Sequence, residues 1–217
     1  MRINGLIFDF DGLILDTETP DLCAWLKVYE KYGQSFDFNN YSKAIGAIYE
    51  FSQPAEILAT LVPGLSKQLV LNEWFALERQ MLDEQNLSQG IEELLKEAKA
   101  SNLKIAIASS SINDWVVGHL DNFGIRQYFN SICTVDLTGI PKPDPALYNL
   151  ALKSLNLQSC EVIAFEDSPN GIAAAKSAGI YCVAIPNPTT RMLNLSDADL
   201  VIDSLVDFSL SELIKDL

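Results

Sequence analysis

The sequence is poor in basic residues and has no long hydrophobic run. It contains 15 Lys and Arg residues against 29 Asp and Glu residues, a formal net charge of −14. Binding to nucleic acid phosphates or to anionic membrane surfaces needs clustered Lys and Arg, so we expect neither kind of partner. No apolar stretch approaches the roughly 20 residues that span a bilayer, so no transmembrane helix is predicted.

Cysteine and histidine are also scarce. Four scattered cysteines (Cys23, Cys133, Cys160, Cys182) form no CxxC pair. We expect buried free thiols and a cytoplasmic location, where thiols stay reduced. The N-terminal stretch MRINGLIFDF lacks a small-residue cleavage site, so no signal peptide is predicted. The single histidine, His119, has no evident triad partner and is interpreted as structural.

The sequence does have short apolar runs that alternate with helical patterns. The runs predicted to be strands are residues 3–8, 103–109, 131–135, 161–165 and 181–185. The patterns predicted to be helices are residues 91–101, 112–124, 145–156 and 169–179. Near-continuous apolar strands that alternate with helices predict an α/β fold, a doubly wound parallel sheet covered on both faces.

One segment interrupts this alternation. Between about Asp16 and Gln89 the patterns are helical and no strand is evident, although half of the chain's aromatic residues lie there. We therefore expect an α/β core formed by residues 1–16 and 89–217, with a helical insertion at residues 17–88. The aromatic residues indicate that the insertion has a small core of its own.

Two carboxylates stand in the apolar run LIFDFDGLIL. Burying an ionised carboxylate is costly unless a positive group lies beside it, so Asp9 and Asp11 are expected at the end of the strand, facing a cation. The carboxyl ends of parallel strands meet at one edge of a sheet. The other polar groups that follow predicted strands are Ser109–Ser111, Lys142 and the pair Glu166–Asp167.

These clusters together contain carboxylates for a hard cation, hydroxyls and amides for an oxyanion, and one fixed positive charge. This set suits phosphoryl transfer, in which charge on three phosphate oxygens must be neutralised. Each cluster taken alone is more typical of helix capping or of an ordinary turn than of a catalytic site. The functional interpretation depends on their meeting at one edge.

The stretches DFDGLILDTE, IASSS, PKPDP and FEDSPNG resemble, in this order, the four motifs of the haloacid dehalogenase (HAD) superfamily. The chain is similar to the β-phosphoglucomutase-like branch along essentially its whole length. The resemblance implies a HAD-like, Rossmann-type core and makes the helical insertion a cap domain. It also implies an enzyme, a phosphoric monoester hydrolase, that acts as a monomer.

The resemblance assigns roles to the strand-end residues. Asp9 would be the nucleophile that forms an aspartyl-phosphate, and Asp11 the general acid and base. Lys142 would neutralise the transferred group, while Ser109 and the amides near Ser110 and Gly12 would hold phosphate oxygens.

The resemblance also implies a Mg²⁺ cofactor. The ion would be bound by the carboxylates of Asp9 and Asp167 and by the backbone carbonyl of Asp11. Glu166 would support the metal through a water or an indirect hydrogen bond. Without a cation, four acids gathered at one point would repel one another.

Three departures from the branch separate a phosphatase from a mutase. Ile112 stands where the mutases carry a lysine, and the segment SKAIGAIYEFSQPAEIL offers only Lys43 where they carry a cap arginine. Pro20 and Asp21 replace a common histidine. Because each change removes positive charge from the substrate side, a bisphosphorylated intermediate would be poorly held.

The function expected is hydrolysis of a small phosphomonoester, such as a sugar phosphate. The cap segment at roughly residues 42–54, with Lys43, Tyr49, Glu50 and Ser52, would read the leaving group. A phosphomutase remains an alternative. Carbon–halogen hydrolysis would need neither an acid at Asp11 nor a metal ligand at Asp167. A non-catalytic binding module would be expected to have lost one of these residues.

Overall fold

A six-stranded parallel sheet forms the centre of the molecule. The computed structural model describes residues 2–47, 52–206 and 208–217. The strand order is β3-β2-β1-β4-β5-β6, and each neighbouring pair is parallel. The strands are β1 (Gly5–Phe8), β2 (Lys104–Ser109), β3 (Ser131–Thr134), β4 (Val162–Glu166), β5 (Tyr181–Ala184) and β6 (Leu200–Val201). The predicted doubly wound α/β fold is confirmed, and β6 is the strand that the sequence did not predict.

Strand β1 lies in the middle of the sheet, and every residue in it is apolar and buried. Its alternate side chains face opposite sides: Leu6 and Phe8 belong to one hydrophobic cluster and Ile7 to the other. Phe8 stacks on Phe165 of β4 with ring centroids 4.9 Å apart. Such two-sided burial is typical of a parallel strand covered by helices on both faces.

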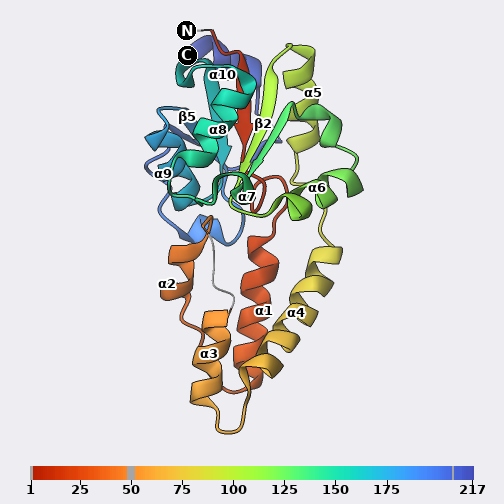
Figure 1. The fold of residues 1–217 in the computed structure, drawn as a ribbon, viewed down its shortest axis with the longest axis vertical. Coiled ribbons are helices and arrows are strands. Elements are labelled where there is room, and N and C mark those ends of the chain that lie inside the picture. Colours follow the sequence, from red (N-terminus) through yellow and green to blue (C-terminus); the bar gives the residue numbers. More distant parts are fainter. Residues whose placement is uncertain (1, 48–51, 207) are drawn as a thin grey trace.

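Helices cover both faces of the sheet (Figure 1). The cluster around Phe8 includes side chains of α5 (Ile91–Ala100), α6 (Asn113–Asn122) and α10 (Leu210–Asp216). The cluster around Ile7 includes side chains of α8 (Ala146–Leu155) and α9 (Pro169–Ser177). The four helices predicted for this part are confirmed. The short helices α7 (Val135–Thr138) and α10 were not predicted.

Four further helices extend from the end of the molecule opposite the chain termini (Figure 1). They are α1 (Glu18–Lys31), α2 (Phe38–Tyr41), α3 (Ser52–Leu61) and α4 (Lys67–Asp83). Trp25 stacks on Trp74 with centroids 5.0 Å apart in a separate hydrophobic cluster. The described residues between 17 and 88 contain no strand, and Leu87 forms only an isolated bridge to Leu15.

Asp21 lies inside this helical segment. The hydroxyl of Tyr41 donates to its Oδ2 at 2.7 Å, and the indole N–H of Trp74 donates to its Oδ1 at 2.9 Å. Burial raises the pKa of Asp21 to about 6, although these hydrogen bonds act in the opposite direction. The sequence interpretation placed Asp21 at the substrate side, and the structure instead directs its carboxylate into the core of the helical segment.

The raised pKa of Asp21 predicts a pH-dependent stability. Because the folded state binds the proton more tightly than the unfolded state, the free energy of unfolding falls as pH rises from about 4 to about 6. Above this range the loss is about 3 kcal/mol. We expect Asp21→Asn, which is neutral throughout, to remove this part of the pH dependence. Melting temperatures of the wild type and of Asp21→Asn, measured between pH 4 and pH 7, test this prediction. Parallel plots of melting temperature against pH for the two proteins would contradict it.

Two expectations from composition have mixed outcomes. Cys133 and Cys182 are buried free thiols, as expected, but Cys160 is exposed and Cys23 is only partly buried. The prediction of four buried thiols was therefore wrong for these two residues. Within the described ranges, no helix has both the length and the apolar character needed to cross a membrane.

Candidate active site

The predicted site residues meet at the carboxyl end of the sheet. Asp9 directly follows β1, and its amide donates to the carbonyl oxygen of Phe165 at 3.0 Å. Ser109 and Glu166 end β2 and β4, and Lys142 lies in the loop between α7 and α8. Because parallel strands end at the same edge, the chain brings residues more than a hundred positions apart into one buried cluster.

Lys142 is a fully buried cation between two carboxylates. Its Nζ lies 2.7 Å from Oδ1 of Asp9 and 2.6 Å from Oε1 of Glu166. The hydroxyl of Tyr148 donates to the same Glu166 oxygen at 2.5 Å. Burial disfavours the charged lysine, but the attraction of Asp9 and Glu166 outweighs it and raises the pKa of Lys142 above its ordinary value. Lys142 is therefore a fixed positive charge.

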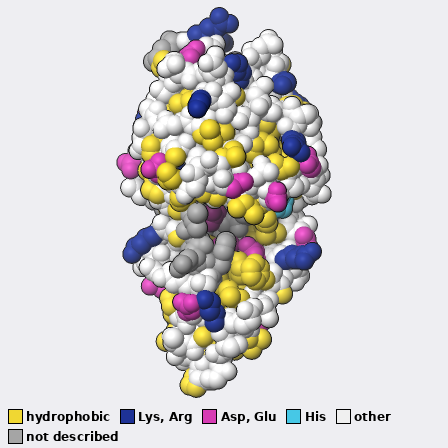
Figure 2. All heavy atoms as spheres, in the orientation of Figure 1, with side chains coloured by type: hydrophobic (Ala, Val, Ile, Leu, Met, Phe, Trp, Pro, Cys, Tyr) yellow, Lys and Arg dark blue, Asp and Glu magenta, His cyan; other side chains and the backbone are white. Residues whose placement is uncertain are grey.

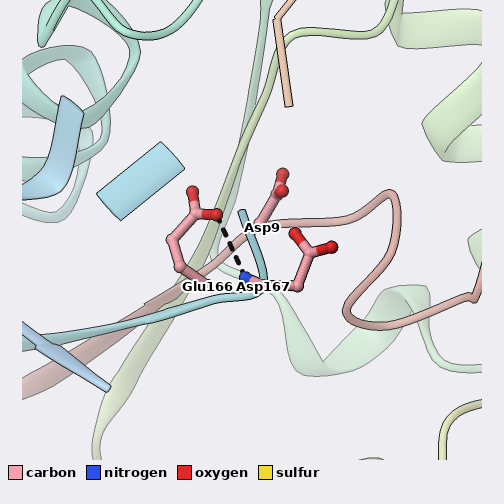
Figure 3. A group of neighbouring side chains, drawn as sticks. All are labelled: Asp9, Glu166 and Asp167. Carbon is pink, nitrogen blue, oxygen red and sulfur yellow. Dashed lines mark hydrogen bonds between the residues drawn. The ribbon is translucent and has the colours of Figure 1, made fainter. Parts of the chain in front are cut away.

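Three carboxylates form a compact acidic group beside this lysine. Asp9, Glu166 and Asp167 each place an oxygen within 4.8 Å of the others (Figure 3). Burial, followed by the charge of Glu166, raises the pKa of Asp9 to about 8. Burial and then the charge of Asp9 raise the pKa of Asp167 well above its ordinary value. A bound cation would relieve this repulsion.

The hydrogen bonding of Asp167 fits a metal ligand. Its Oδ2 accepts from Nδ2 of Asn187 at 2.8 Å, whereas its Oδ1 is buried and has no hydrogen-bond partner among the residues that the structure describes. A buried unsatisfied oxygen in a native structure calls for an explanation such as an ion. Carboxylate oxygens are the ligands that Mg²⁺ prefers, so the residues present fit the expected metal.

Asn187 was missed by the sequence interpretation. Besides Asp167, its Nδ2 donates to the carbonyl oxygen of Gly12 at 3.1 Å. Its Oδ1 accepts from the amides of Thr189 and Thr190, each at 2.9 Å. Asn187 thus fixes the carboxylate of Asp167 against the loop that follows β1. It follows β5, so the rule that polar residues gather at strand ends could have identified it.

Gly12 occupies a turn that no larger residue could enter. Its φ is +79°, and an added Cβ would lie 2.2 Å from Oδ2 of Asp167. The amide of Gly12 donates to the carbonyl oxygen of Leu15 at 2.7 Å. The donor that the resemblance assigned to phosphate binding is therefore used within the turn itself.

Asp11 is held apart from the acidic group. Its Oδ2 accepts from Ser111 Oγ at 2.6 Å and lies 3.4 Å from Ser109 Oγ. Its Oδ1 accepts from the indole N–H of Trp115 at 2.9 Å. The side chain of Asp11 does not belong to the metal-compatible group, and only its backbone carbonyl remains as a candidate ligand. Neither Trp115 nor the role of Ser111 was predicted.

The loop after β2 also contacts the helical segment. Ser110 Oγ donates to the carbonyl oxygen of Gly46 at 3.1 Å and accepts from the amide of Lys142 at 3.2 Å. Asn170, in the first turn of α9, donates to the carbonyl oxygens of Lys43 at 3.0 Å and Ile45 at 2.8 Å. These bonds join the helical segment to the core beside the buried cluster that contains Lys142.

The expected substrate-facing residues are only partly placed by the structure. The side chain of Lys43 is exposed, and Ser52 begins α3 and is partly buried. Tyr49 and Glu50 lie outside the described residues. The face seen in Figure 2 is hollowed between the helical segment and the sheet, and acidic side chains are visible in the hollow.

Two acids of the helical segment lie close enough to Asp11 to interact with its charge, and neither was predicted. Burial raises the pKa of Glu18 well above its ordinary value, and the charges of Asp21 and Asp11 add to this effect. Burial likewise raises the pKa of Glu78 to about 8, with Asp21 and Asp11 again contributing. Among the described residues that are buried, Lys142 is the one cation.

Comparisons with known proteins agree with this geometry. The sequence model of the family described as haloacid dehalogenase-like hydrolase matches residues 6–185. The YhcW protein of Bacillus subtilis is 39% identical over 219 residues, which cover 99% of this chain and 98% of that protein. A Thermotoga maritima protein named phosphorylated carbohydrates phosphatase is 30% identical over 181 residues, 82% of each chain. A solved β-phosphoglucomutase from Clostridium difficile has a TM-score of 0.74 and 28% identity, covering 99% of this chain and 96% of that one.

Proposed function

The chain belongs to the haloacid dehalogenase-like hydrolase family, and we propose that it is a Mg²⁺-dependent phosphatase of a small phosphomonoester. One observation carries the proposal. Buried Asp9 lies 2.7 Å from the fixed cation Lys142 and beside Asp167, whose buried Oδ1 has no hydrogen-bond partner in the described part of the chain. A nucleophile, a positive charge and a metal-ligand oxygen thus meet at one point, which is the requirement for phosphoryl transfer.

The reaction proceeds in two steps through Asp9. Lys142 and the amide of Phe10 both bind Oδ1 of Asp9, the latter at 2.7 Å, so Oδ2 is the oxygen that attacks phosphorus. The Oδ2–phosphorus bond forms as the bond to the leaving oxygen breaks, and Asp11 gives that oxygen its proton. Asp11 then takes a proton from the water that attacks the aspartyl-phosphate, which releases phosphate and restores Asp9.

Mg²⁺ would be held by the carboxylates of Asp9 and Asp167 and by the backbone carbonyl of Asp11. When bound, it supplies positive charge that offsets the acidic group and the phosphate oxygens. Glu166 is engaged by Lys142 and Tyr148 through Oε1, which supports an indirect role in which it orients the lysine rather than binding the ion.

The helical segment at residues 17–88 is proposed to act as a cap that selects the leaving group. Its joining points to the core lie beside the site, and the bonds from Ser110 and Asn170 reach its loop at residues 43–46. A closed cap excludes polymers and bulk water. The relative named for phosphorylated carbohydrates supports a sugar phosphate or a similar metabolite as substrate.

A phosphomutase is the second candidate, because a β-phosphoglucomutase shares the fold over nearly the whole chain. Against it, the exposed Ile112 stands at the position of the mutase lysine, and Lys43 is the one basic residue of the cap segment at 42–58. Release of inorganic phosphate from a panel of sugar phosphates would favour the phosphatase. Conversion of a sugar 1-phosphate to the 6-phosphate without phosphate release would favour the mutase.

Metal dependence is the direct test of the proposed chemistry. Chelation is expected to abolish phosphate release from p-nitrophenyl phosphate, and Mg²⁺ is expected to restore it. Because bound ion stabilises the folded state by mass action, the free energy of unfolding should rise by about 2.7 kcal/mol at a hundredfold excess of Mg²⁺ over its Kd. Asp167→Asn is expected to fold and to lose this stabilisation. Full activity after exhaustive chelation would refute the mechanism.

A further inference from the structure

Two donors from the region after β2 hold both oxygens of Asp11. The indole N–H of Trp115, in the first turn of α6, donates to Oδ1 at 2.9 Å. The hydroxyl of Ser111 donates to Oδ2 at 2.6 Å. A carboxylate on a short side chain has two free torsions, and a bond to each oxygen fixes both of them. The orientation of Asp11 is therefore set by residues about a hundred positions away in the sequence.

Resting on the proposed function, we propose that Trp115 is a positioning residue that, together with Ser111, aims the carboxylate of Asp11 at the leaving-group oxygen. A general acid is effective only when it lies within hydrogen-bond reach of its target, and a small displacement costs rate. Among the described residues, Trp115 hydrogen-bonds to no member of the acidic group and not to Lys142, so Asp11 is the site residue on which it acts directly.

The chemistry of the two donors distinguishes the two oxygens of Asp11. An indole N–H can only donate, so Oδ1 stays an acceptor in both steps of the reaction. A hydroxyl can donate or accept, so Ser111 can adapt when Oδ2 gains or loses a proton. Oδ2 also lies 3.4 Å from Ser109, a predicted phosphate ligand. Oδ2 is thus the oxygen that exchanges the proton.

Packing keeps the indole of Trp115 in place. The ring of His119, one turn further along α6, meets it edge-on with centroids 4.4 Å apart. The ring centroid of His119 in turn lies 6.0 Å from that of Phe10, the residue between Asp9 and Asp11. The single histidine is thereby given the structural role that the sequence indicated, as a support for Trp115.

The test compares leaving groups that differ in their need for a proton. Because kcat/KM covers only the steps up to phosphoryl transfer to Asp9, it reports leaving-group departure. p-Nitrophenolate is a good leaving group and departs without a proton. The phenolate of phenyl phosphate is a poorer leaving group and depends more strongly on receiving a proton. We expect Trp115→Phe, which keeps an aromatic ring but removes the donor, to lower kcat/KM about tenfold for phenyl phosphate, and at least about fivefold more than for p-nitrophenyl phosphate.

Matched variants separate positioning from general damage. Ser111→Ala is expected to show the same selective loss, and Ser111→Thr, which keeps the hydroxyl, to restore it. Trp74→Phe makes the same substitution in the helical segment and should leave the ratio between the two substrates unchanged. In an Asp11→Ala background, Trp115→Phe should cause no further selective loss, because residues that act as a unit are not additive.

Each outcome decides one claim. Equal losses on both substrates, or a further selective loss in the Asp11→Ala background, would overturn the positioning role while leaving the phosphatase intact. A folded wild type that releases no phosphate from either substrate with Mg²⁺ would overturn the proposed function instead. If Trp115→Phe fails to fold, the Ser111→Ala and Ser111→Thr pair decides the claim.

Discussion

Replacing Asp9 with Asn is expected to lower phosphate release by at least about a thousandfold without loss of the fold. The amide is nearly isosteric with the carboxylate but is a poor nucleophile. Its oxygen can still accept from Lys142 and from the amide of Phe10, which bind Oδ1 in the wild type. Because Asp9 is one of three mutually repelling carboxylates, its neutralisation should not lower the melting temperature in the absence of metal.

Initial rates on p-nitrophenyl phosphate with saturating Mg²⁺ measure the effect. Asp136→Asn makes the same substitution at an exposed position of α7 and is expected to keep wild-type turnover. Acid-quenched wild type incubated with radiolabelled substrate should retain label that the Asp9→Asn protein lacks. Near-normal turnover of Asp9→Asn would assign the nucleophile to another residue.

The sequence predicted the fold, and it predicted which residues would gather at one edge of the sheet, because both follow from strand boundaries. Apolar runs locate the strands, and the polar residue after each run locates a point on one sheet edge. This reasoning required no knowledge of side-chain packing. Asp9 and Lys142 are 133 positions apart in the sequence, yet their contact follows from strand order and loop position alone.

Features that depend on packing between helices were not predictable in this way. The pattern over residues 112–124 predicts a helix but does not say that the Trp115 indole reaches Asp11. Asp21 was placed at the substrate side because the resemblance implies a histidine at this position. Its burial depends on Tyr41 and Trp74, which come from two other helices. No local sequence pattern predicts that these side chains contact Asp21.

The short elements were missed for a different reason. Strand β6 has two residues and α7 has four, so each contains only about one period of its apolar pattern, too little to be recognised. They form because neighbouring elements supply partners: β6 pairs with β5, and its amino-terminal neighbour Asp199 binds the amide of Cys182 at 2.8 Å. Contacts with neighbouring elements determine whether such short elements form, and these contacts are difficult to predict from a single sequence.

Replacing Lys142 with Met is expected to lower the free energy of unfolding by about 3–5 kcal/mol and turnover by at least about a hundredfold. The side chain of Lys142 lies between Asp9 and Glu166, and only 1% of its surface is exposed. Removing one partner of a buried ion pair leaves uncompensated charge, and here two carboxylates lose their cation. Urea unfolding and initial rates, both with and without Mg²⁺, measure the two effects.

The control is Lys176→Met, which removes the partly exposed ion pair with Asp199 and is expected to cost no more than about 1 kcal/mol. A second substitution separates charge from shape: Glu166→Gln in the Lys142→Met protein removes one unpaired charge and keeps an oxygen that can accept from Tyr148. Stability should recover in part, because one buried charge is gone. Turnover should not recover, because the transferred phosphoryl group still lacks its cation. A Lys142→Met protein no less stable than Lys176→Met would show that Asp9 and Glu166 need no buried partner, and the electrostatic account of this site would fail.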